Sequence, residues 1–196
     1  DRAGLVGADG QTHHGCFDPA FLSQVPGMTV LCPSSFSELK EMLHFALFSV
    51  TGPVTIRYPR GAESVYKGCS LPVQFTPLRE GSDFTVLTYG ILVNEALKAA
   101  DILEKSGISV RVLKLNRIAP LSADEVSAML KGTTRLLVLE DCRVRWAASC
   151  GSGPGGRGKA GQADFEKLRL DSAHRGQRRA AVQLTEAGRG RCGRIY

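Results

Sequence analysis

The sequence predicts a layered α/β fold made of two successive β-α-β patterns. Short apolar runs that are typical of strands alternate with longer amphipathic stretches opened by helix-capping residues. The runs lie at 28–32, 54–58, 84–89, 110–115 and 135–140. This alternation favours parallel strands covered by helices. The apolar share of 43% is ordinary for a soluble globular protein.

The first pattern follows a glycine-rich segment. Asp18-Pro19 is a typical helix start and predicts a short helix over 18–25. Ser35-Phe-Ser-Glu38 has the spacing of a capping box, which opens a helix that continues to about Ser49. Gly52-Pro53 ends that helix before the next strand.

The second pattern begins beyond residue 82. A helix over about 93–106 stops at Gly107, a usual position for a C-terminal glycine. Ser122-Ala-Asp-Glu125 is another capping box and opens a helix to about Lys131. Residues 62–82 contain Pro, Gly and polar residues without periodicity, so we expect them to be a linker between two domains.

The last 51 residues, from Trp146, differ in composition from the rest. They hold ten of the 22 glycines and 10 Lys/Arg against 4 Asp/Glu, whereas residues 1–145 hold 15 of each kind. Few periodic apolar positions remain: Phe165, Leu168, Leu170, Val182 and Leu184. We therefore expect no packed fold after Arg145, and a sheet edge and face left uncovered. A disordered basic tail and a translational frameshift in a GC-rich gene are the two explanations, and the gene sequence decides between them.

Composition excludes several classes of protein. No run approaches the ~20 apolar residues of a membrane span. The positive net charge of +6 belongs to the tail, so it does not indicate a nucleic-acid-binding domain. The six cysteines include no Cys-x-x-Cys pair, which disfavours a metal site and favours free thiols in a cytoplasmic protein.

The glycine-rich segment from Asp1 to Gly15 carries most of the chemistry. It places two acids, an arginine and two histidines among four glycines. Glycine lets the backbone approach a ligand closely, Asp and His exchange protons or hydrogen bonds, and Arg presents a planar fork to phosphate or carboxylate. The segment therefore predicts contact with a small anionic ligand.

Four motifs carry a family resemblance: Asp1-Arg-Ala-Gly4, Gly7-Ala-Asp-Gly10, Thr12-His-His-Gly15 and Arg57-Tyr-Pro-Arg-Gly61. In this order they resemble the pyrimidine-binding domain of the 1-deoxy-D-xylulose-5-phosphate synthases, which are transketolase-like, thiamine-diphosphate-dependent enzymes. The resemblance continues to about Asp141, where Glu140-Asp141 ends the third strand of the second pattern.

The resemblance implies a domain organisation. Residues 1–61 would be the C-terminal half of a thiamine-diphosphate pyrimidine-binding domain, and 62–82 a linker. Residues 83–145 would be an incomplete transketolase C-terminal domain. The irregular, basic tail would span 146–196, frameshifted or disordered.

The resemblance also implies an activity and a site. The family condenses pyruvate with D-glyceraldehyde 3-phosphate, releases carbon dioxide and supplies precursors of isoprenoids, thiamine and pyridoxal. Arg2 and Arg60 would bind the triose phosphate, His13 would exchange protons with the bound intermediate, and Asp9 would orient substrate hydroxyls or the histidine. For Asp9 a purely structural role in the loop is equally expected. Arg57 should point elsewhere along its strand.

Thiamine diphosphate and Mg²⁺ belong to the full-length enzyme by this resemblance. The residues that hold them lie upstream in the family, so we expect this chain alone to bind neither, to contain no metal site and to be inactive. A homodimer and a cytoplasmic location, or a plastid one in a plant, are implied for the parent. The alternatives are a fragment of a transketolase or of a 2-oxoacid dehydrogenase β subunit, or a non-catalytic interaction module that docks on a partner.

Overall fold

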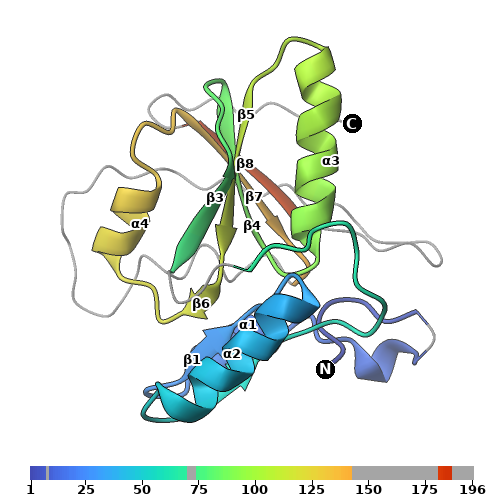
Figure 1. Ribbon diagram of the computed structural model, residues 1–196, viewed down its shortest axis with the longest axis vertical. Coiled ribbons are helices and arrows are strands. Elements are labelled where there is room, and N and C mark those ends of the chain that lie inside the picture. The colour runs from blue at the N-terminus through green and yellow to red at the C-terminus, as the bar shows by residue number, and fades with distance from the viewer. Residues whose placement is uncertain (8, 70–73, 143–180, 187–196) are drawn as a thin grey trace.

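The computed structural model describes residues 1–7, 9–69, 74–142 and 181–186, and its elements alternate as an α/β fold requires (Figure 1). In chain order they are η1 (Gln11–His13), α1 (Asp18–Leu22), β1 (Thr29–Leu31), α2 (Phe36–Phe48), β2 (Val54–Ile56), β3 (Phe75–Arg79), β4 (Phe84–Tyr89), α3 (Leu92–Lys105), β5 (Val110–Leu115), β6 (Arg117–Ala119), α4 (Ala123–Met129), β7 (Arg135–Glu140) and β8 (Ala181–Glu186). Every helix and strand expected before residue 141 is present, with ends that differ by a few residues.

The strands form two sheets. The smaller has the order β2-β1-β6 and the larger β3-β5-β4-β7-β8. Within them β1 and β2 are parallel, as are β5, β4 and β7, which confirms the parallel arrangement predicted from the β-α-β patterns. In Figure 1 the smaller sheet and α2 lie below the larger sheet.

The two sheets are tied together by β6, which the sequence analysis did not predict. It follows β5 after a single residue and pairs antiparallel with β1 of the smaller sheet. A three-residue strand with no alternation of its own leaves no sequence signal. The pairing places the ends of β1, β5 and β7 beside one another.

The helix starts confirm one predicted capping box and modify the other. At α4, Ser122 Oγ accepts from Glu125 N at 3.1 Å, and the Glu125 carboxylate accepts from Ser122 N at 2.9 Å. At α2, Ser35 Oγ accepts from Glu38 N at 3.1 Å. The Glu38 carboxylate accepts instead from Ser34 N at 2.7 Å, because it is turned into the interior.

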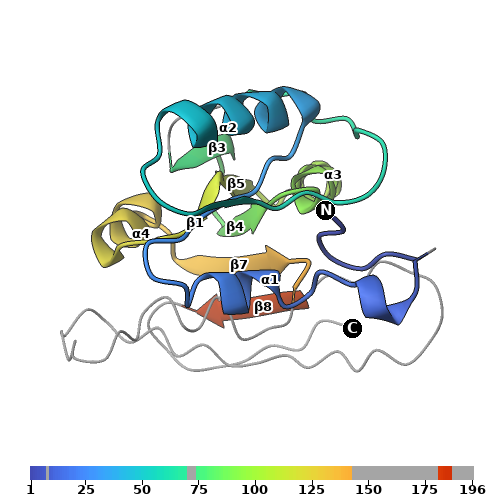
Figure 2. The same ribbon diagram turned by 90° about the horizontal axis from the view of Figure 1, so that it is seen from below.

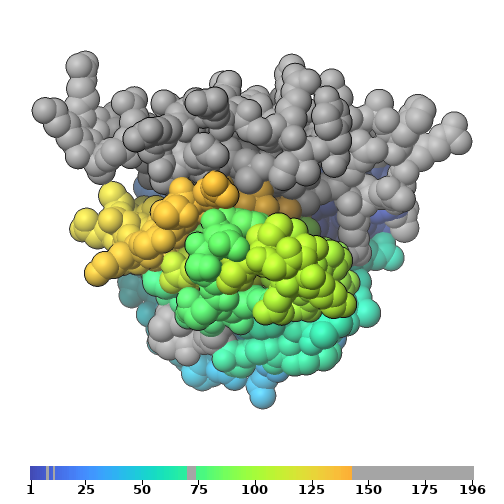
Figure 3. All heavy atoms as spheres, turned by 90° about the horizontal axis from the view of Figure 1, so that it is seen from above, coloured from blue at the N-terminus to red at the C-terminus, as the bar shows by residue number. Residues whose placement is uncertain are grey.

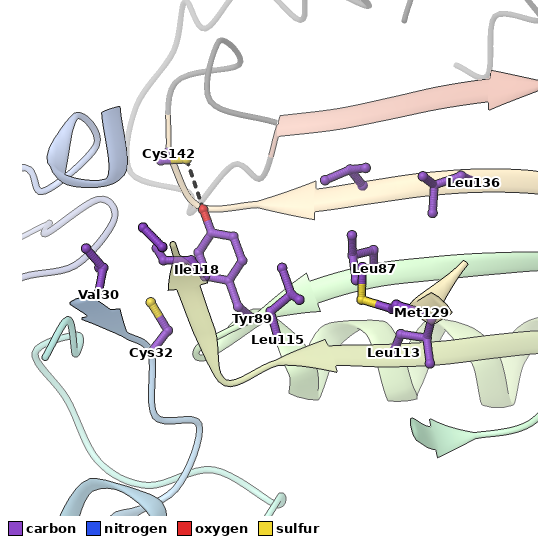
Figure 4. Close-up of a cluster of buried hydrophobic side chains, with 12 residues drawn as sticks. Val30, Cys32, Leu87, Tyr89, Leu113, Leu115, Ile118, Met129, Leu136 and Cys142 are labelled. Carbon is purple, nitrogen blue, oxygen red and sulfur yellow. Dashed lines mark hydrogen bonds between the residues drawn. The ribbon is translucent and has the colours of Figure 1, made fainter. Parts of the chain in front are cut away.

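The larger sheet is covered on both faces, which explains why apolar residues of its central strands point to either face. Val86 belongs to a cluster with Ala96 and Ala100 of α3. Its neighbour Leu87 points to the opposite face, into a cluster with Met129 of α4 (Figure 4). The second cluster also includes Val30 and Cys32 of the smaller sheet, so the two sheets share one core.

The segment expected to be an irregular linker contains β3. It pairs antiparallel with β5 at the edge of the larger sheet, with Pro77 opposite Leu113. Proline is tolerated in an edge strand, where one row of backbone groups faces away from the sheet. In Figure 3 the turn after β3 lies beside α3, and Arg79 of β3 forms ion pairs of 2.6 Å with Asp101 and Glu104. The domain boundaries themselves stay predictions.

The expectation that the edge of β7 is uncovered is wrong. β8, within the predicted tail, pairs antiparallel with β7 along its whole length (Figure 2). An edge strand offers unpaired N–H and C=O groups, so a single short segment is enough to pair with it. Residues 143–180 and 187–196, which include the rest of the tail, lie outside the described residues. The structure therefore tests neither the expected disorder of the tail nor a frameshift.

Candidate functional site

The glycine-rich loop is folded back on itself and anchored to the end of β2. Ala3 N donates to Tyr58 O at 3.0 Å, and Gly15 N donates to Arg2 O at 3.0 Å and to Gly4 O at 2.9 Å. A Cβ at Gly15 would lie 2.5 Å from Arg2 O, so only glycine fits there. Arg2 has a φ of 66°, a left-handed conformation that is strained for a residue with a side chain.

Asp9 lies between two arginines, Arg2 near the beginning of the chain and Arg60 after β2. Arg2 Nε donates to Asp9 Oδ2 at 2.8 Å, and Arg60 donates to Asp9 Oδ1. Hydrogen bonds from Arg60 and then Arg2 lower the pKa of Asp9 to about 2. The carboxylate therefore stays ionised at neutral pH and holds two permanent positive charges together.

A cleft of about 490 Å³ opens beside Arg60. Its walls include Gly4 of the loop, Arg60, the beginning of α3 near Asn94, and Asp141 after β7. Residues of the N-terminal unit (1–61) and of the C-terminal unit (83–142) therefore both line this cleft. The Arg60 side chain is 57% exposed, so it is available to a ligand that enters this cleft.

The two histidines of the glycine-rich loop, His13 and His14, differ in exposure and in hydrogen-bond partner. His13 is exposed, and its Nδ1 lies 3.0 Å from Thr12 Oγ1. His14 Nδ1 accepts from Val6 N at 3.0 Å and holds the loop. Among the contacts of the described residues, none joins His13 to Asp9. The structure thus brings Arg2, Asp9 and Arg60 together and leaves His13 apart from them.

Arg57 is buried and points away from Arg60, as expected from its strand. Its Nη1 donates to Asp141 Oδ1 and its Nη2 to Gly15 O, both at 2.7 Å. Its Nε is 3.5 Å from Asp18 Oδ2. The sequence analysis missed this network because Asp141 is far from Arg57 in the sequence. The one sequence signal for a partner of Arg57 was the pair of acids, Glu140 and Asp141, at the end of β7.

A second buried group lies next to this network. Tyr89 Oη and Cys142 Sγ are 3.0 Å apart (Figure 4), and Cys142 Sγ is 3.6 Å from Glu140 Oε2. Burial raises the pKa of Glu140 to about 7; the hydrogen bond with Cys142 opposes this shift and the charge of Asp141 adds to it. The four cysteines that the structure describes are free thiols, as expected.

In the part of the chain that the structure describes, no three His, Cys, Asp or Glu side chains are grouped so that they could bind a metal ion. Among the same residues, none of the helices is long and apolar enough to span a bilayer.

Comparison with family models matches both units. Residues 1–64 match the transketolase pyrimidine-binding domain, and residues 74–151 match the transketolase C-terminal domain. The 1-deoxy-D-xylulose-5-phosphate synthase of Chlorobium phaeovibrioides is 42% identical over 146 residues, which is 72% of this chain and 23% of that enzyme. The synthase of Heliobacterium modesticaldum is 34% identical over 190 residues, which is 93% of this chain and 27% of that enzyme. The chain thus spans about a quarter of these relatives.

Solved structures agree on the fold. A split-gene transketolase described as an inactive β4 tetramer has a TM-score of 0.56 and 28% identity, over 64% of this chain and 42% of that one. A Pichia stipitis transketolase in complex with sedoheptulose 7-phosphate has a TM-score of 0.57 and 21% identity, over 67% of this chain and 20% of that one. The second likeness concerns the fold alone.

Proposed function

The chain belongs to the transketolase family, and from this premise we propose that it forms the C-terminal part of a 1-deoxy-D-xylulose-5-phosphate synthase. The parent enzyme would condense pyruvate and D-glyceraldehyde 3-phosphate to 1-deoxy-D-xylulose 5-phosphate with loss of carbon dioxide. The observation that carries the proposal is the pairing of Arg2 and Arg60 through Asp9 at the edge of the cleft. Two guanidinium groups held together suit a phosphate dianion.

In this proposal the three residues act as one anion site. Asp9 holds the guanidinium groups at a fixed separation before the substrate arrives, which lowers the entropy lost on binding. The phosphate of the triose then competes for their remaining N–H groups. His13, on the same loop but exposed, would donate or accept a proton at the reacting carbons once substrate is bound.

The family is thiamine-diphosphate-dependent, and in that family the residues that hold the cofactor lie upstream of the segment that this chain matches. We therefore assign thiamine diphosphate and Mg²⁺ to the remainder of the parent enzyme, and derive no step through them here. This chain alone should bind neither and should be inactive. We also propose a homodimeric parent in the cytoplasm of a bacterium, and the free thiols of the described cysteines support the location.

Arg60→Ala in the full-length parent is expected to raise the KM for glyceraldehyde 3-phosphate far more than the KM for pyruvate. A lost charge-assisted hydrogen bond is worth roughly 1.5–3 kcal/mol, or about tenfold or more. Steady-state kinetics with each substrate varied in turn measures both constants. Arg79→Ala is the matched control, because Arg79 forms two ion pairs outside the cleft. Equal effects of Arg60→Ala on both substrates would remove Arg60 from the phosphate site.

His13→Ala in the parent is expected to lower kcat while leaving thiamine diphosphate affinity nearly intact. A positioned proton donor or acceptor contributes about 10²–10⁴-fold to a rate. His14→Ala is the comparison, because His14 holds the backbone of Val6 and should affect stability instead. Cofactor titration and kcat together decide the matter: a fall in cofactor affinity at unchanged kcat would make His13 structural.

A second candidate function is that of a subunit completed by a separate chain. The outer surface of α2 favours it, since Phe36, Leu47 and Phe48 are 59%, 74% and 74% exposed. Large exposed apolar side chains on one helix are typical of an interface. An open reading frame for the upstream domains, separate from that of this chain, would support this arrangement, and a continuous frame would exclude it.

A further inference from the structure

We propose that Asp141, which follows β7 in the C-terminal unit, is a positioning residue for the anion site on the glycine-rich loop and acts through Arg57. This inference rests on the proposed function, because the anion is taken to be the phosphate of the triose substrate. It assigns the C-terminal unit a role in substrate affinity, although the two arginines of the site belong to the N-terminal unit.

Both terminal nitrogens of Arg57 donate hydrogen bonds to groups that surround the loop. Its side chain is 3% exposed, so it does not reach the cleft. Asp141 accepts from one terminal nitrogen and the Gly15 carbonyl from the other, at the same distance of 2.7 Å. Removal of the Asp141 charge would leave this buried cation with the Asp18 carboxylate, 26% exposed and 3.5 Å away, as its neighbouring counter-charge.

Gly15 carries the effect of Arg57 to Arg2. The Gly15 carbonyl accepts from Arg57, while the Gly15 amide donates to the carbonyls of Arg2 and Gly4. These hydrogen bonds hold the backbone from the Arg2 carbonyl to the Gly4 carbonyl. Since Arg2 has a positive φ, which is held only when the surroundings require it, a shift of Gly15 would let Arg2 relax.

Asp141 also contacts the loop directly. A Cβ at Gly4 would lie 2.9 Å from Asp141 Oδ2, so the carboxylate is packed against the backbone two residues after Arg2. One oxygen of Asp141 thus binds Arg57 and the other lies on the loop. Together these contacts set the direction of the Arg2 side chain toward Asp9, and through Asp9 the place of Arg60.

The test is isothermal titration of the full chain with glycerol 3-phosphate, a triose phosphate that does not react. Asp141→Asn keeps the shape and one acceptor but removes the charge. It is expected to weaken binding by about threefold to tenfold, as for residues that couple to a site without contacting the ligand. In an Arg2→Ala background the same substitution should have no further effect, because it acts through the Arg2 side chain that is already removed.

The control is the double variant Glu38→Gln/Lys114→Met, which removes another buried ion pair between the same two units. It should keep its affinity for glycerol 3-phosphate within about twofold, since it does not touch the loop. Unchanged or tighter binding by Asp141→Asn, or additive losses in the Arg2→Ala background, would overturn the positioning role. If Arg60→Ala itself bound like the wild type, the phosphate site under Proposed function would be wrong instead. A wild-type chain that does not bind would overturn both.

Discussion

Lys114→Met is expected to lower the free energy of unfolding of this chain by about 3–5 kcal/mol, the usual result of removing one partner from a buried ion pair. Lys114 Nζ lies 3.0 Å from Glu38 Oε1, and both side chains are 0% exposed. Burial lowers the pKa of Lys114, and the Glu38 carboxylate opposes that shift. In the variant, Glu38 would remain buried without this cation, beside the neutral donors Ser34 N and Tyr66 Oη.

Urea denaturation followed by circular dichroism measures this loss, and the chain supplies a matched control. Lys98 and Glu95 form an ion pair of the same 3.0 Å length, but the two side chains are 56% and 62% exposed. Lys98→Met should change the stability by less than about 1 kcal/mol, because water screens the pair. A loss from Lys114→Met as small as that from Lys98→Met would mean that the buried pair is not formed in solution.

Glu140→Gln is expected to stabilise the chain at pH 8 by roughly 3 kcal/mol and to have little effect at pH 4. The reason is that burial raises the pKa of Glu140 from 4.5 to about 7. Between these values the folded state keeps a proton that the unfolded state has released. The stability of the wild type therefore falls as the pH rises from 4.5 to 7, and a neutral glutamine removes that fall.

Unfolding free energies measured at intervals from pH 4 to 8 test this expectation. Glu125→Gln is a control of opposite sign, because hydrogen bonding to Ser122 lowers the pKa of Glu125. That substitution should reduce stability at pH 8 and lose its effect as the pH falls below the usual range of a carboxyl. A Glu140→Gln profile parallel to that of the wild type would show that Glu140 titrates normally.

Local patterns in the sequence predicted most of the regular structure. The capping residues Ser35 and Ser122 begin helices where expected, because a cap needs only the residues of the next turn. The strand-like runs became strands because their apolar side chains are buried on both faces of a sheet. The ends of these elements moved by a few residues, as tertiary contacts decide where a helix or strand frays.

The candidate site was predicted in part. The residues of the loop and of the Arg57-to-Gly61 motif were selected together, and three of them, Arg2, Asp9 and Arg60, lie in contact. His13 is apart from them, and the expected orientation of the histidine by Asp9 is not seen, since Asp9 is held by two arginines. The sequence does not show whether the Asp9 carboxylate binds a histidine or an arginine, because both kinds of residue lie in the same motifs.

The sequence alone determined the α/β class and the order of the elements before residue 141, because each of these depends on neighbours within a few positions. Only the tertiary structure decided that β6 joins the two sheets, that β8 covers β7, and that Arg57 is paired with Asp141, 84 residues away. These contacts join residues that are far apart in the sequence, so no local pattern predicts them. For the buried Arg57, the loss of water also makes the charge costly unless a partner such as Asp141 is present.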